Sequence, residues 1–247
     1  MKNSANFTPT DDDVFGRIAY RYDFLCDLFS LGIHRLWKRR VAQIIGNAPW
    51  QNLLDVASGT GDIVYRILQQ RLFNDNILNK TTDSSYQIIV SDISLQMLDK
   101  AKKKVANYSA NMVFMQLDAE NLIQIESESQ DVVSISLGLK ICDRDKALQE
   151  AYRVLKPNGR LVILEASNIP INWIHRLYLG YMSIVMPLIG RLATGGDSSA
   201  YQYLLRGVKD FPTAEALAQE ISAIGFSEVS FERLSFGIVA IHTARKL

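Results

Sequence analysis

The chain has 247 residues, 48% of them hydrophobic, which is enough to bury a substantial core in one α/β domain. Lys and Arg number 27 and Asp and Glu 26, so the net charge of +1 provides no field that would gather nucleic acid. The two cysteines lack a Cys-x-x-Cys spacing, which argues against a disulfide framework or a zinc site and fits a reducing cytoplasm.

The first 46 residues predict helices that precede the sheet, and we expect them to cover a substrate site. The extreme amino terminus is polar and carries Asp11, Asp12 and Asp13. It lacks the basic and then apolar order of a signal peptide, so we expect the protein not to be exported.

An alternation of short apolar runs and helical patterns follows, which is typical of a parallel sheet built from βαβ units. The five runs predicted as buried strands are Asn52–Ala57, Gln87–Ser91, Met112–Leu117, Asp131–Leu137 and Arg160–Glu165. The helical patterns are Ile63–Gln70, Ser94–Asn107 and Asp143–Leu155, the last of which Pro157, Asn158 and Gly159 should end. Between the first helix and the second strand, the polar stretch Phe73–Ser85 predicts a long surface loop.

The last third of the chain predicts a helical insertion over 170–210, then a helix over Thr213–Ile224 and a strand pair over Ser227–Leu234 and Gly237–Thr243. Charges and Pro187 interrupt the apolar run Ile171–Ala193, so it should not span a bilayer. We therefore expect a single domain over 1–247 with a Rossmann-like, doubly wound, seven-stranded sheet, mostly parallel with an antiparallel edge strand.

The strongest local signal is the turn after the first strand, where Gly59-Thr60-Gly61 leads into a helix. Glycines there let the backbone approach a ligand, but the third glycine of a dinucleotide fingerprint is missing. Asp55 and Asp62 flank the turn and suit a ligand with an ammonium and a sulfonium, both of which S-adenosylmethionine (SAM) carries.

Two further carboxylates follow the next strands. Asp92 comes just after the second strand, where it can accept hydrogen bonds from ribose hydroxyls. Asp118 comes just after the third, where it can accept one from an adenine amine. Each could also be an ordinary turn residue, but together they predict a SAM site. A nicotinamide dehydrogenase is the rival, since Tyr152-x-x-x-Lys156 matches one catalytic spacing, yet Pro157 ends that helix.

Several longer motifs resemble the UbiE/MenG family of ubiquinone and menaquinone biosynthesis C-methyltransferases, a branch of the class I methyltransferases. They run over Phe15–Asp23, Ser30–Lys38, Ser136–Leu139, Arg153–Arg160, Tyr201–Leu204 and Gly237–His242 and cover nearly the whole chain. The resemblance implies that Thr60, Asp92, Asp118, Ala119 and Ser136 contact SAM. With neighbouring residues, the predicted cofactor set is Asp55, Ala57, Gly59, Thr60, Gly61, Asp92, Ile93, Met97, Asp118, Ala119 and Ser136.

The chain departs from the family pattern where substrate identity is decided. Lys140-Ile141 stands in place of an Arg-Asn pair, and Ser199-Ala200-Tyr201 in place of Asp-Ser-Tyr. We expect Lys140 to stabilise a phenolate, although lysine lacks the planar fork of arginine, and Tyr22 and Tyr201 to orient the ring. The alternative for each tyrosine is that it only packs in the core or at its rim. The alternative for Lys140 is that it is an ordinary solvated surface charge.

The resemblance implies carbon methylation of a demethylated ubiquinone or menaquinone precursor. The alternatives are methylation of another hydrophobic small molecule and a SAM-binding paralogue that transfers no methyl group. The lack of ligand spacing around His34, His175 and His242 predicts no metal.

Two surface features of the sequence bear on partners. The aromatic and apolar residues Trp37, Trp173, Tyr178, Tyr181 and Met182 could form a lid that admits a prenyl tail, or simply be core. Arg35, Lys38, Arg39 and Arg40 predict a basic patch for transient contact with an anionic bilayer, at the inner face of the membrane. The lysines Lys100, Lys102, Lys103 and Lys104 fit a solvated helix face better. A homodimer and a complex for quinone biosynthesis are left open.

Overall fold

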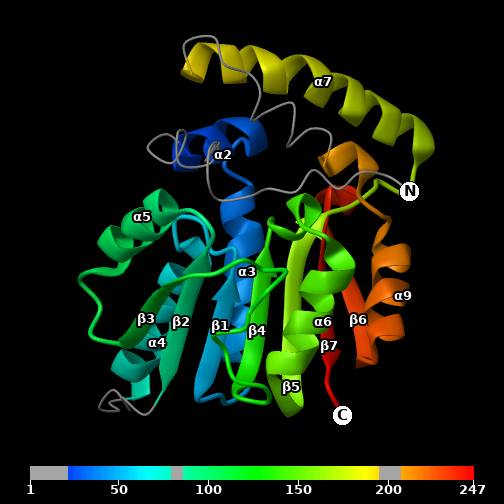
Figure 1. Cartoon of the computed structure of the whole chain (residues 1–247). Coiled ribbons are helices and arrows are strands. Elements are labelled where there is room, and N and C mark those ends of the chain that lie inside the picture. The colour runs from blue at the N-terminus through cyan, green and yellow to red at the C-terminus, as the bar shows by residue number, and fades with distance from the viewer. Residues whose placement is uncertain (1–21, 79–85, 195–206) are drawn as a thin grey trace.

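The computed structural model describes residues 22–78, 86–194 and 207–247, and its seven strands form one sheet in the order β3-β2-β1-β4-β5-β7-β6. The strands are β1 Asn52–Val56, β2 Gln87–Asp92, β3 Asn111–Gln116, β4 Gln130–Ser136, β5 Leu155–Ala166, β6 Ser227–Leu234 and β7 Val239–Arg245. The first five are parallel, and β7 runs antiparallel between β5 and β6. The predicted doubly wound sheet with an antiparallel pair at its edge is therefore confirmed (Figure 1).

Helices cover both faces of the sheet, which is why its central strands are apolar on both sides. One face packs against α3 His34–Gly46, α4 Asp62–Leu78 and α5 Leu95–Val105. The other packs against α6 Arg144–Val154 and α9 Ala214–Ile224. Successive residues of β1 show the alternation, since Leu53 belongs to the first core and Leu54 to the second.

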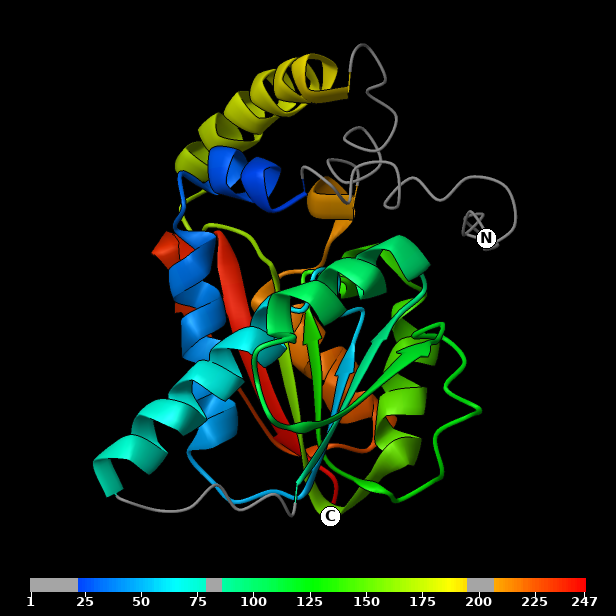
Figure 2. The ribbon, with the colours of Figure 1, turned by 90° about the vertical axis from the view of Figure 1, so that its left-hand side faces the viewer.

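Two more helices lie beyond the carboxyl ends of the parallel strands, where open α/β sheets bind ligands. These are α2 Tyr22–Ser30 and α7 Asn172–Thr194, which lie side by side above the sheet (Figures 1 and 2). Their positions match the predicted helical segments over 1–46 and 170–210, apart from the residues outside the described ranges. That these segments cover a substrate, and that the chain is one domain, stay predictions.

The boundaries differ from expectation at two places. The helix α4 continues to Leu78, so the predicted loop over Phe73–Ser85 is wrong for its first six residues. Extending an established helix costs little per residue, and the polar residues there did not stop it. The strand β5 already begins at Leu155 and takes in the Pro157-Asn158-Gly159 turn, with a register shift against β4 between Gln130 and Val132.

Within 22–78, 86–194 and 207–247, no helix is both long enough and apolar enough to cross a bilayer.

Candidate cofactor and active site

The turn between β1 and α4 has the backbone that its sequence predicts. Gly59 and Gly61 have φ angles of +56° and +75°, a region that side chains disfavour. A Cβ at Gly59 would meet nothing within 4 Å, so space lies open beside the loop. A Cβ at Gly61 would lie 2.9 Å from the Cβ of Ala101 on α5. The first glycine therefore leaves room next to the loop, and the second lets α5 pack closely on it.

Asp92 ends β2 and fixes this loop. Its Oδ2 accepts a hydrogen bond from the backbone N–H of Gly59 at 2.8 Å, and its Oδ1 accepts one from Ser94 at 2.9 Å. A carboxylate oxygen has two lone pairs, so both oxygens can still accept a further donor. Asp92 thus lies at the predicted place, and it also holds the glycine loop in position.

Asp55, on β1, is the other carboxylate at the centre of the sheet. It is fully buried, and its Oδ1 accepts a short hydrogen bond from the hydroxyl of Ser134 on β4. Its Oδ2 has no partner among the described residues. Burial, reinforced by the charge of Asp92, raises the pKa of Asp55 to about 7. A buried carboxylate oxygen without a hydrogen-bond donor fits a site in which a cationic ligand supplies that donor.

The remaining predicted cofactor residues come from the ends of neighbouring strands. Asp118 is half-buried and caps its own turn by accepting from the Glu120 N–H at 2.9 Å, and Ala119 next to it is buried. The buried Ser136 hydroxyl at the end of β4 has no partner in the part of the chain described. Ala57 and Ile93 lie in the connections after β1 and β2, and the buried Met97 lies in the first turn of α5. The structure thus brings the predicted set to one end of the sheet.

Thr60 differs from its predicted role in one respect, since its side chain is already engaged within the protein. The hydroxyl donates to Asp23 Oδ1 at 2.6 Å and accepts from Lys104 Nζ at 2.9 Å. Asp62 likewise uses both oxygens on lysines rather than leaving them for a ligand, with Lys38 at 2.8 Å and Lys104 at 2.7 Å. Its predicted part in drawing a cationic ligand is therefore wrong.

Lys140 follows β4 in a short 3₁₀ turn, and only 7% of its side chain is exposed. Its ammonium donates to the Leu137 carbonyl and to Glu165 Oε1, the latter at 3.1 Å. Glu165 is fully buried at the end of β5, and its other oxygen accepts the Lys140 backbone N–H. Lys140 is therefore a buried member of an ion pair, and the alternative of a solvated surface charge is wrong.

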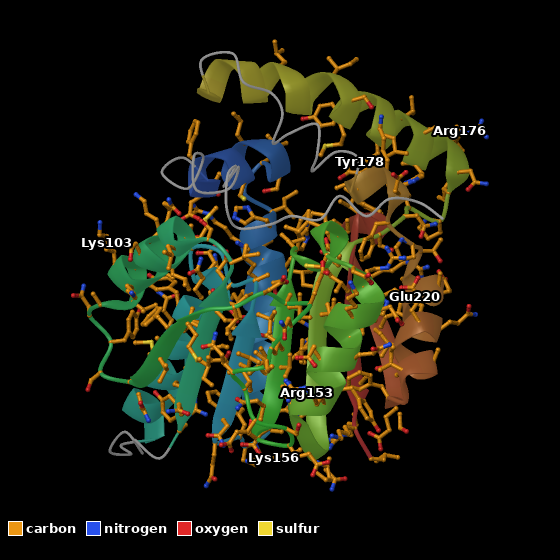
Figure 3. All side chains as sticks on the ribbon, in the orientation of Figure 1. Lys103, Arg153, Lys156, Arg176, Tyr178 and Glu220 are labelled. Atoms are coloured by element: carbon orange, nitrogen blue, oxygen red, sulfur yellow. The ribbon has the colours of Figure 1, made fainter. Side chains whose placement is uncertain are left out.

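The rival catalytic pair lies elsewhere. Tyr152 packs edge-on against Phe226, and Lys156 pairs with Asp131 at 2.7 Å. Figure 3 shows Lys156 at the opposite end of the sheet from α7, away from the glycine loop. The dehydrogenase interpretation therefore has no support from the geometry.

Known proteins resemble the chain over nearly its full length. The model of the ubiE/COQ5 methyltransferase family matches residues 5–246. The chain belongs to this family. A ubiquinone/menaquinone biosynthesis C-methyltransferase UbiE from Rickettsia typhi is 38% identical, over 96% of this chain and 92% of that protein. A mitochondrial 2-methoxy-6-polyprenyl-1,4-benzoquinol methylase from Schizosaccharomyces pombe is 39% identical, over 95% of this chain and 78% of that protein.

Solved structures confirm the fold of this UbiE/COQ5 member. A SAM-dependent methyltransferase from Thermotoga maritima superposes with a TM-score of 0.62 at 17% identity and covers 95% of this chain and 98% of its own. Family and fold together make the protein a SAM-dependent methyltransferase. The orphaned oxygens of Asp55 and Ser136 and the open space beside Gly59 fit that cofactor.

The residues predicted around the substrate are only partly described. The side chain of Tyr22 and the whole of Tyr201 lie outside the described part of the chain, so their roles stay predictions. The predicted lid divides in two. Trp37 is buried in the core and donates to Ser235, while Tyr178 and Met182 are at least half-buried on α7. Trp173 and Tyr181 are exposed.

The predicted basic patch is largely neutralised by nearby carboxylates. Arg35 pairs with Asp27, Lys38 with Asp62, and Arg40 with Glu232. Arg39 is exposed. Of the four cations only Lys38 is buried, while Arg35 and Arg40 stay partly exposed beside their carboxylates, so contact of this patch with an anionic bilayer stays a prediction.

Two functional neighbours escaped prediction although a signal was present. Glu165 and Ser134 are polar residues in the buried stretches of β5 and β4. A buried polar group needs a partner, so such a residue near a strand's carboxyl end is itself a hint of a site. The partners Lys140 and Asp55 could not be paired with them without the sheet order.

Proposed function

We propose that the protein transfers the methyl group of SAM to a ring carbon of a demethylated ubiquinone or menaquinone precursor. The observation that carries this is the match, over 92% or more of each chain, to a UbiE of the same reaction class. An apolar substrate also suits the elements above the site, since both α2 and α7 are rich in apolar and aromatic residues.

We propose that the loop at Gly59 and the carboxylates of Asp92 and Asp118 hold the adenosine part of SAM. Asp55, with its unpartnered oxygen, would accept from the ammonium of the methionine part. When bound, SAM supplies an electrophilic methyl group on a sulfonium. The protein then needs chiefly to hold the ring carbon in line with that methyl group and to exclude water.

Lys140 is the residue we propose to act on the substrate. A ring carbon becomes nucleophilic when the neighbouring hydroxyl has lost its proton to bulk water, and a cation close to that oxygen stabilises the phenolate. The ring proton that the methyl group replaces leaves to solvent after the transfer. Two of the three N–H groups of Lys140 are used by Leu137 and Glu165, which leaves one for a substrate oxygen. Glu165 would position the ammonium, while Tyr22 and Tyr201 would orient the ring.

Incubation with labelled SAM and a panel of quinone precursors tests this function, with the label located by mass spectrometry. Label on a ring carbon of a demethylated precursor is the expected result. Label found only on other apolar metabolites would mean that the substrate is not a quinone precursor. The panel includes such metabolites because Lys140-Ile141 departs from the family pattern. Tight SAM binding without any transfer would contradict enzymatic function.

We also propose that the protein touches an anionic membrane surface through α7. The exposed residues Trp173, Leu177, Tyr181, Ile184 and Leu188 recur at spacings of three and four and form one stripe of that helix, named here the apolar stripe. The buried Met182 and half-buried Tyr178 lie on the other side. Neither α3 nor α7 contains an acidic residue, so repulsion from anionic lipid is small. A homodimer and a complex of quinone-pathway enzymes stay predictions.

A further inference from the structure

Five side chains interlock beside the glycine loop, and they come from four helices and the loop itself. Asp23 belongs to α2, Lys38 to α3, Asp62 to α4, Lys104 to α5 and Thr60 to the loop. Lys104 Nζ is the centre, since it donates to Asp23 at 2.7 Å, to Asp62 at 2.7 Å and to Thr60 at 2.9 Å. We name these five residues the loop network. The sequence had placed Lys104 on a solvated helix face, and this prediction is wrong.

The charges of the loop network balance, with two carboxylates facing two ammonium groups. Burial alone would raise the pKa of Asp62, but the charges of Lys38 and Lys104 outweigh it and hold that pKa below its usual range. All three N–H groups of Lys104 have acceptors. The network is therefore complete as it stands, and removal of one member leaves another without its partner.

The members differ in how well water reaches them. Lys38, Asp62 and Lys104 have side-chain exposures of 8%, 15% and 21%, whereas Asp23 has 47%. Ion pairs at such an exposed position are weak, so the contacts of Asp23 are the ones that break at least cost. Lys104 would keep Asp62 after Asp23 has left. The loop network thus has a permanent part and a releasable part.

Asp23 joins two parts of the molecule that otherwise meet little. The helix α2 packs on α3 and α7 at the carboxyl end of the sheet (Figures 1 and 2). Its Asp27 pairs with Arg35 of α3 instead of with the glycine loop. Asp23 instead reaches Thr60, the side chain between Gly59 and Gly61, and Lys104 of α5. Among the described residues, Asp23 therefore ties the position of α2 to the conformation of the cofactor loop.

We propose that Asp23 is a positioning residue, a latch that holds α2 closed over the cofactor loop and sets Thr60 for SAM binding. When Asp23 releases Thr60 and Lys104, α2 is free to move and the cofactor can exchange. When the latch closes, the loop is ordered and the cofactor is retained. The coupling is reciprocal, so bound SAM must in turn hold α2 more firmly on the loop.

The test is SAM affinity of the full chain by titration calorimetry, with no methyl acceptor present. We expect Asp23→Asn to bind SAM about 10-fold more weakly, in the range of typical coupling between linked sites. Asp27→Asn is the matched control, because it removes a carboxylate of the same helix that contacts α3 instead of the loop. Its SAM affinity should equal that of the unchanged protein.

Hydrogen exchange separates a latch from a general loss of stability. In Asp23→Asn, amides of α2 and of residues 59–61 should exchange faster, while the central strands keep their protection. A double-mutant cycle with Thr60→Val measures the coupling between Asp23 and Thr60. We expect the loss of SAM affinity in the double variant to be clearly smaller than the sum of the losses in the two single variants. Asp23→Glu keeps the charge and should recover part of the affinity.

The proposal is overturned by any of three results. The first is unchanged SAM affinity in Asp23→Asn, and the second is an equal loss in Asp27→Asn. The third is full additivity with Thr60→Val. Should Asp23→Asn not fold, the same cycle with Asp23→Ser, which also removes the carboxylate, decides. Because the measurement needs no acceptor, its result is independent of the quinone substrate.

Discussion

The carboxyl group of Asp55 is buried at the centre of the sheet, close enough to Asp92 for their charges to repel, and its pKa is raised to about 7. The proposed contact with the SAM ammonium needs the ionised form. Below pH 7 the carboxyl group of Asp55 must lose a proton before this contact forms. The affinity for SAM should therefore fall as the pH is lowered, by at most about 10-fold per pH unit. Above pH 7 this dependence should disappear.

Calorimetry in buffers of different ionisation enthalpy measures the proton released on SAM binding. Near pH 6 we expect close to one proton to be released by the unchanged protein. Asp55→Asn cannot ionise and should bind more weakly at pH 8, without this slope. The same pH dependence in Asp55→Asn would assign the titration to another group.

Lys140 permits a second prediction for a single residue. Lys140→Met leaves the fully buried Glu165 without its counter-ion and should cost about 3 kcal/mol of unfolding free energy. It should also slow methyl transfer, because the phenolate loses its cation. Chemical denaturation and turnover against pH measure the two effects.

The double variant Lys140→Met with Glu165→Gln is the control for stability. It removes both charges and should regain most of the lost unfolding free energy while transfer stays slow. Unchanged turnover of Lys140→Met across pH would remove Lys140 from the mechanism. Rescue of turnover by Glu165→Gln would show that only the structural role is real.

The positions of these residues could be predicted from the sequence, but their hydrogen-bond and ion-pair partners could not. Asp55, Asp92 and Gly59 were expected at strand ends, because carboxyl ends of parallel strands meet at one edge. That Asp92 holds Gly59, that Ser134 faces Asp55 and that Glu165 neutralises Lys140 depend on register between strands far apart in the sequence. Local pattern carries no information about such pairs.

At the scale of secondary structure, the two glycines of the loop allow a matched comparison. Gly61→Ala would place a Cβ 2.9 Å from that of Ala101, at a φ of +75°. The clash and the strained backbone should together cost roughly 2–4 kcal/mol of stability. Gly59→Ala meets only open space and should cost about 1 kcal/mol, but it should weaken SAM binding at least 10-fold.

Thermal unfolding and SAM titration of both variants give the comparison. Gly61→Ala should lose mainly stability, and Gly59→Ala mainly cofactor affinity. A Gly59→Ala variant that binds SAM normally would mean that the cofactor does not approach the backbone at that point. The two residues would then share only a structural role.

Whole elements were predicted more reliably than their ends. Six of the seven strands lie within two residues of their predicted bounds, because short runs between turn signals mark them, whereas β5 begins five residues before its predicted start. The end of α4 was misjudged because Asn and Asp at a helix end resemble a loop in composition. The sequence predicts α7 only as part of a longer helical insertion. Its exposed stripe is apolar, so the alternation of polar and apolar residues that usually reveals the bounds of a helix is missing.

At the scale of the whole molecule, the apolar stripe of α7 lies at the end of the protein that carries the candidate site (Figure 1). A membrane-dissolved substrate would reach the site most directly if that end rested on the bilayer. Leu177→Ser and Ile184→Ser should therefore weaken binding to anionic vesicles, each by roughly 5- to 10-fold for partial loss of apolar burial.

Co-sedimentation with vesicles that contain or lack anionic lipid measures this binding. Ile123→Ser is the matched control, because Ile123 is 79% exposed but lies between β3 and β4 instead of on α7. It should bind vesicles like the unchanged protein. Vesicle binding through the apolar stripe should depend only weakly on salt. Arg39→Gln should reduce the preference for anionic lipid, because it removes an exposed positive charge. Equal binding of all these variants, or no binding to vesicles at all, would mean that the stripe meets a different partner and that the substrate reaches the site from solution.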